Sequence, residues 1–110
     1  MNKKKIYISL PISGRNIEIV KVECLNAKIE IENSEFEAVS PLEVSNDPNA
    51  TYSEHMGKDI AALLDCDAAV FLDGWRDSKG CMLELFACRI YTKHIFYGLN
   101  DFVENRYKLI

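Results

Sequence analysis

A chain of 110 residues has room for one hydrophobic core, and we expect a single domain over residues 1–110. Its composition, 48% hydrophobic and 27% charged, is typical of a globular protein. The net charge of −4 argues against binding to a nucleic-acid polymer or to an anionic membrane surface, because both require a broad basic face.

The sequence also limits location and cofactor chemistry. The first apolar stretch, residues 6–12, is short and is broken by Pro11, so neither a secretory signal nor a membrane span is predicted. The four cysteines lie in apolar patterns without a C-x-x-C spacing, which indicates reduced, buried thiols in a cytoplasmic protein. The two histidines have no paired ligands, so we expect no metal site and no metal or organic cofactor.

The first half of the chain predicts two strands and one helix. Residues 5–10 are apolar and β-branched, which favours a strand that ends at Pro11. Apolar residues recur at spacings of three and four over residues 15–33, which favours a helix, although local alternation competes with that pattern. Residues 36–39 form a short second strand, and residues 41–50 an irregular polar loop.

The second half continues the alternation. A capping-box pattern, Thr51-x-x-Glu54, opens a helix that runs to about residue 65. Residues 68–72 are continuously apolar, as in a buried parallel strand, and residues 94–98 form a fourth strand. The tail, residues 99–110, adds a short helix or a fifth strand. Between the last two predicted strands a helix runs from about residue 80 to about residue 92, with an expected inward face of Leu83, Phe86, Ala87 and Ile90.

This alternation predicts a three-layer α/β fold, flavodoxin-like or Rossmann-like, with a parallel sheet of four to five strands and helices on both faces. In such a sheet, ligands bind beyond the carboxyl ends of the strands, where the strand order reverses. The rule selects the loops at residues 10–14 and 73–80. Their polar side chains are Ser9, Ser13, Asp73, Trp75, Arg76, Asp77, Ser78 and Lys79.

Two acidic residues and one tyrosine are candidates for chemistry. Glu84 lies near the start of a helix, where the helix dipole favours an ionised carboxylate, as a nucleophile requires. Position alone favours the simpler interpretation, in which Glu84 only complements that dipole. Asp59 lies beside apolar helix positions and is either a general acid or a solvated surface residue. Tyr7 lies on the strand face opposite Ile6 and Ile8, where it either orients the nucleophile or packs in the core.

Other candidates have two interpretations as well. Ser13 and Ser78 either contact a sugar or phosphate oxygen or form turns. Gly80 leaves room for a ligand against the helix end. Trp75 either stacks on a base or packs over the end of the sheet, and His55, one helical turn before Asp59, either tunes that residue or lies on the surface.

Three segments carry a family resemblance. Residues 6–14 (IYISLPISG) are similar to the first strand and sugar-binding turn of the nucleoside 2-deoxyribosyltransferase-like family. Residues 59–72 resemble its D-x₇-D passage from helix to strand, and residues 78–87 (SKGCMLELFA) resemble the segment that carries its nucleophile. The chain resembles most closely the small branch of uncharacterised bacterial and phage proteins in this family.

The resemblance implies roles for individual residues. It implies Glu84 as nucleophile, Asp59 as general acid/base and Tyr7 as the residue that orients the nucleophile. It also implies a homo-oligomer, since a neighbouring subunit often completes the active site in this family. The substrate-binding residues expected from the loops and the resemblance together are Ser9, Ser13, Gly14, Asp73, Trp75, Ser78 and Gly80.

The leading hypothesis is cleavage or transfer at the N-glycosidic bond of a (deoxy)nucleoside or its 5′-monophosphate, through a covalent glycosyl-Glu84 intermediate. An alternative is a nucleotide-binding or sensing module without turnover, because Cys81, Met82 and Phe86 depart from the pattern of the best-characterised transferases. A third possibility is a structural or oligomerising domain. This one applies if Asp59 and Glu84 lie on opposite faces.

Overall fold

The computed structural model describes residues 3–110, so the first two residues of the predicted domain lie outside the described part. Strands and helices alternate along the chain as the sequence predicts. In chain order the elements are β1 (Lys5–Ser9), α1 (Ile17–Asn33), β2 (Glu37–Val39), α2 (Pro41–Val44), α3 (Tyr52–Leu64), β3 (Ala68–Phe71), η1 (Trp75–Asp77), α4 (Lys79–Ile90), β4 (His94–Tyr97), α5 (Leu99–Asn105) and η2 (Arg106–Leu109).

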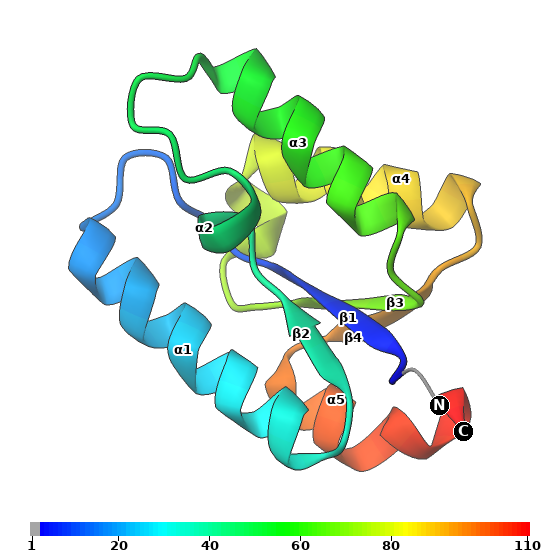
Figure 1. Cartoon of the computed structure of the whole chain (residues 1–110). Coiled ribbons are helices and arrows are strands. Elements are labelled where there is room, and N and C mark those ends of the chain that lie inside the picture. The colour runs from blue at the N-terminus through cyan, green and yellow to red at the C-terminus, as the bar shows by residue number, and fades with distance from the viewer. Residues whose placement is uncertain (1–2) are drawn as a thin grey trace.

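The four strands form one parallel sheet in the order β2-β1-β3-β4. Helices α3 and α4 cover one face of this sheet, and α1 and α5 cover the other (Figure 1). The predicted three-layer α/β fold is therefore confirmed. The tail, for which a helix and a fifth strand were both open, forms α5 and η2.

The core on the α1 side joins one face of the sheet to one stripe of α1. Ile6 and Ile8 of β1 are fully buried there, together with Val70 of β3 and Phe96 of β4. Because apolar residues on α1 repeat at helical spacing, one side of the helix meets the sheet along its length. The buried stripe consists of Val20, Cys24, Ala27 and Ile31; Ile17, which shares the predicted spacing, lies at the start of the helix and is 45% exposed.

The core on the α3 side contains the opposite face of the same strands. Tyr7, Ala69 and Phe71 point to this side and pack against Leu63 of α3 and Leu85 of α4. The predicted burial of the cysteines is also confirmed. All four are buried free thiols: Cys24, Cys66, Cys81 and Cys88.

The predicted inward face of α4 was wrong. Leu83, Phe86 and Ile90 are 49%, 50% and 73% exposed, and only Ala87 of the predicted set packs against the core. The residues that face the sheet are Cys81, Glu84, Leu85 and Cys88. Because α4 carries apolar residues on both sides, the periodicity alone did not decide which side is buried.

Side-chain caps fix the starts of helices α2 and α3. Thr51 and Glu54 form the predicted capping box at the start of α3. Residues 41–50 are not irregular throughout, because Ser40 caps a helical turn, α2, that begins at Pro41. Proline at the first helical position has no N–H to leave unpaired, which favours this start.

Within residues 3–110, no helix combines the length and hydrophobicity that crossing a bilayer would require.

Candidate functional site

The sheet reverses its strand order between β1 and β3, because the chain passes from β1 to β2 on one side and later to β3 on the other. The loops after β1 and β3 meet at this point. Gly74 has a φ of 89°, and a Cβ built on it would lie 3.3 Å from the Cγ of Pro11. Two closely packed loops therefore border the predicted location of the site, beyond the carboxyl ends of these two strands.

A cavity of about 1260 Å³ opens at this edge of the sheet. Its walls come from the β1–α1 loop, the start of α1, the segment between α2 and α3, one face of α3, the β3–α4 loop and the start of α4. Asp59 and Glu84 both line it. The two acidic residues are thus brought to one hollow, and not to opposite faces of the fold.

Glu84 lies in the second turn of α4 and is only 4% exposed. The Tyr7 hydroxyl donates a hydrogen bond of 2.6 Å to Oε2, and the Ser9 hydroxyl donates one of 2.7 Å to Oε1. Tyr7 and Ser9 are two residues apart on β1, so both side chains point to the α4 side of the sheet. Each carboxylate oxygen therefore has its own donor from the central strand.

Burial raises the pKa of Glu84 to about 7, against the opposing effect of the two donated hydrogen bonds, and the charge of Asp59 raises it further. This corrects the expectation that the helix dipole holds Glu84 ionised. Glu84 lies beyond the first turn and inside the protein, so desolvation outweighs the dipole. The pKa of Tyr7 is also raised, first by burial and then by the charge of Glu84, so the phenol keeps the proton that it donates.

Asp59 faces the cavity from the middle of α3 and is 7% exposed, not a solvated surface residue. Among the described residues its Oδ1 atom has no hydrogen-bond partner. Burial raises the pKa of Asp59 to about 6, although the charge of His55 lowers it in part. A buried carboxyl oxygen without a partner is costly, so this atom is suited to a group that a ligand brings.

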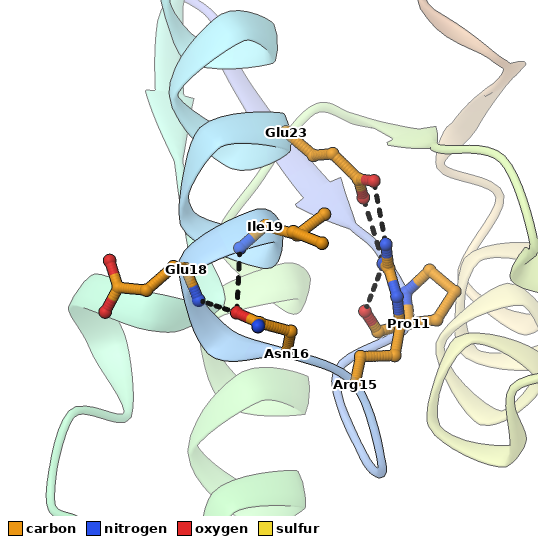
Figure 2. A network of polar contacts seen from close by, with 6 residues as sticks. All are labelled: Pro11, Arg15, Asn16, Glu18, Ile19 and Glu23. Atoms are coloured by element: carbon orange, nitrogen blue, oxygen red, sulfur yellow. Dashed lines mark hydrogen bonds and ion pairs between the residues drawn. The ribbon is translucent and has the colours of Figure 1, made fainter.

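The β1–α1 turn forms one wall and is braced by polar contacts (Figure 2). Arg15 donates two hydrogen bonds to the Glu23 carboxylate, of 2.9 and 2.7 Å, and one of 3.0 Å to the Pro11 carbonyl. The Asn16 side chain accepts from the backbone N–H groups of Glu18 and Ile19 and so caps α1. The bidentate pair ties the turn to the second turn of α1.

His55 also lines the cavity, one helical turn before Asp59 on α3. Its Nδ1 atom shares a hydrogen bond with the hydroxyl of Ser45, which follows α2. Residues four apart on a helix lie on the same side, so His55 and Asp59 face the same space.

The remaining predicted contacts divide into two groups. Ser9 lies beneath Glu84 and bonds to it, Gly14 lies in the β1–α1 turn with a φ of 77°, and Trp75 packs against Phe71 and Tyr97. For Trp75 the structure therefore supports packing over the end of the sheet rather than a stacking surface in the cavity. Four predicted residues do line the cavity: Ser13, Asp73, Ser78 and Gly80.

Two details change how Ser78 and Gly80 are interpreted. The Ser78 hydroxyl accepts a hydrogen bond from the Cys81 N–H and caps α4, so it shapes the wall that it lines. A Cβ on Gly80 would lie 3.4 Å from the sulfur of Met56 and 3.5 Å from the hydroxyl of Tyr52. The glycine therefore sets a close approach between α4 and α3 as well as leaving room in the cavity.

Two contacts at the cavity were not predicted from the sequence: the hydrogen bond of Ser45 to His55 and the ion pair of Arg15 with Glu23. Arg15 lies in the turn before α1 and Glu23 in its second turn, a relation that no local pattern indicates, and Ser45 reaches His55 across a loop. No group of three or more histidine, cysteine or acidic side chains within residues 3–110 is arranged to hold a metal ion.

The raised pKa of Glu84 predicts a specific dependence of stability on pH. Ionising Glu84 costs more in the folded than in the unfolded chain, so this group lowers the free energy of unfolding as pH rises from about 4.5 to about 7. Glu84→Gln removes that loss. We expect the variant to gain about 3 kcal/mol on the wild type between pH 4.5 and pH 8, measured by urea denaturation.

Glu104→Gln is the matched control, because Glu104 is exposed on α5. Its difference from the wild type should stay constant over the same pH range. A Glu84→Gln difference that is equally flat would contradict the placement of an ionisable carboxyl in the interior.

No curated protein is significantly similar to this chain. Residues 4–97, which include β1 to β4 and every element around the cavity, match the family described as Domain of unknown function (DUF4406). Since the match covers most of its length, the chain belongs to the DUF4406 family.

Proposed function

We propose that this protein cleaves or transfers the N-glycosidic bond of a nucleoside or nucleoside 5′-monophosphate through a covalent glycosyl-Glu84 intermediate. The supporting observation is a carboxylate buried at the cavity wall, with a hydroxyl donor on each oxygen and a second carboxyl group in the same cavity. The resemblance of residues 6–14, 59–72 and 78–87 to the nucleoside 2-deoxyribosyltransferase-like family points the same way.

The first step breaks one bond and forms another. An oxygen of Glu84 attacks the anomeric carbon, and the electron pair of the C–N bond leaves with the base. Asp59 transfers its proton to the departing nitrogen and becomes a carboxylate. In the second step, Asp59 takes a proton from water, whose oxygen displaces Glu84; with a second base as acceptor the same step gives transfer.

This division of labour needs Glu84 ionised and Asp59 protonated. Burial raises the pKa of both groups, to about 7 for Glu84 and to about 6 for Asp59, and the charge of Asp59 raises that of Glu84 further. The hydroxyls of Tyr7 and Ser9 both donate to Glu84 and favour its carboxylate, whereas the Oδ1 atom of Asp59 has no donor among residues 3–110. These contacts act toward the required state, whereas burial acts against it and keeps the pKa of Glu84 above that of Asp59.

The cavity walls favour a substrate with a sugar and a ring. Leu10, Ile12 and Met56 offer apolar surface, while Ser13 and Ser78 offer hydroxyls at the loop edges. A cavity of about 1260 Å³ holds a nucleotide with room for an acceptor.

A turnover assay tests the proposal. Purified protein is incubated with a panel of nucleosides and their 5′-monophosphates, and the free base is measured by chromatography. We expect base release by the wild type and a loss of about 1,000-fold or more in Glu84→Gln, because the attacking atom is removed.

In the same assay Glu104→Gln should keep full activity, since its side chain is exposed on α5. If the wild type releases no base but is stabilised by a nucleotide, the protein is a nucleotide-binding module and the proposed enzyme activity is contradicted. Equal release by wild type and Glu84→Gln would also contradict it.

We further propose a homodimer formed through the outer side of α4. Leu83, Phe86 and Ile90 project from this side and are about half exposed or more, next to the helix face that carries Glu84. A helix that is apolar on both sides is usually covered on both. The resemblance to a family whose sites are often completed by a neighbouring subunit supports an oligomer.

Light scattering coupled to size-exclusion chromatography measures the mass in solution. We expect a dimer for the wild type and a monomer for Phe86→Glu. Ile19→Glu places the same charge on the exposed side of α1 and should remain a dimer. A monomeric wild type, or dissociation by the α1 variant alone, would exclude the α4 interface.

A further inference from the structure

Ser45, His55 and Asp59 are polar residues of the cavity wall that the proposed reaction does not yet use in full. All three line the cavity, and the hydrogen bond between Ser45 and His55 fixes the imidazole ring. The bond uses Nδ1 and leaves Nε2 for a second partner. Asp59, one helical turn further along α3, has a buried oxygen without a partner among the described residues.

We propose that Ser45 and His55 are a positioning pair for Asp59, in which Ser45 fixes the imidazole and His55 stabilises the negative charge that reaches Asp59 when the glycosidic bond breaks. The inference rests on the proposed function, because it concerns the step in which Asp59 loses its proton.

The charge balance of that step explains why such a pair is needed. Before the step the negative charge is on Glu84, where the hydroxyls of Tyr7 and Ser9 stabilise it. After it, Glu84 is a neutral ester, the base has gained a proton, and the charge is on Asp59. A carboxylate that forms in a desolvated position without donors is unfavourable, so a cation beside it stabilises the product of the step.

His55 is the group placed to supply that cation. When protonated, it donates its Nδ1–H to the Ser45 hydroxyl and keeps its charge on the side of α3 that carries Asp59. Side chains four residues apart on a helix are about 5–6 Å apart at Cβ, close enough for a strong effect of charge.

The other charged groups around Asp59 do not take this role. From α4 come Glu84, Cys81 and Lys79, from β1 Tyr7, and from the segment before α3 Asp47; all but Lys79 are neutral or acidic. Lys79 is exposed, and the two cations across the cavity are paired, Arg15 with Glu23 and Lys21 with Glu18. His55 is the residue whose charge lowers the pKa of Asp59.

A direct titration of Asp59 tests the pair without requiring a substrate. Protein labelled with ¹³C at the aspartate carboxyl carbons is titrated by NMR, and Asp59→Asn identifies the Asp59 signal. In His55→Gln we expect the titration midpoint of Asp59 to rise by about 0.5 to 1 pH unit, because the neutral amide removes a nearby positive charge.

The chain provides a matched control in its other histidine. His94→Gln changes a half-buried residue on β4 that does not line the cavity, and should leave the Asp59 midpoint unchanged. Ser45→Ala frees the ring and should shift the midpoint in the same direction by a smaller amount; it also serves if His55→Gln fails to fold. An unshifted midpoint in both cavity variants, or an equal shift in His94→Gln, would overturn the pairing.

Kinetics with a nucleoside turned over by the wild type then separates the pair from the proposed function. We expect His55→Gln to lower kcat by about 3- to 10-fold with little change in KM. Activity falls as Asp59 loses its proton, so the alkaline limb of the pH profile should move to higher pH. A shifted midpoint with no turnover of any nucleoside by the wild type would overturn the proposed function but not the pairing.

Discussion

The structure depends on one buried contact, the Glu84 carboxylate held by the hydroxyls of Tyr7 and Ser9. A carboxyl group in a protein interior is strongly unfavourable unless its oxygens are hydrogen-bonded. Here two residues of the central strand β1 supply those bonds across the interface with α4. The contact explains why α4 turns its acidic side inward and leaves Leu83, Phe86 and Ile90 outside. Fold and candidate chemistry therefore share one constraint.

This constraint links two helices to one cavity. With its Glu84 side against the sheet, α4 begins beside the loops that end β1 and β3. The close approach at Gly80 then allows α3 to pack against α4, so that Asp59 and His55 face the cavity. The acidic residues share a cavity because parallel topology gathers the carboxyl ends of the strands, and not because they are near in sequence.

The sequence predicted features that follow from local periodicity. The alternation of strands and helices, the buried stripe of α1 and the Thr51 capping box follow from short-range patterns, and the period of two along β1 places Tyr7 on the face opposite Ile6 and Ile8. The buried side of α4 was not predictable in this way, because both sides are apolar. The Ser45–His55 and Arg15–Glu23 contacts join segments through space. For Trp75 stacking and packing both stayed open, because a loop indole satisfies either, and the structure shows packing against Phe71 and Tyr97.

The central claim is that Glu84 attacks an anomeric carbon, and mass spectrometry of a trapped intermediate tests it most directly. A 2′-deoxy-2′-fluoroarabinosyl nucleoside is a suitable probe, because the fluorine slows the hydrolysis of the glycosyl ester more than its formation. The ester therefore accumulates. The account predicts that the protein gains the mass of the fluorinated sugar and that peptide mapping places it on Glu84. Release of base from the same nucleoside without an adduct, or with an adduct on a different residue, would contradict it.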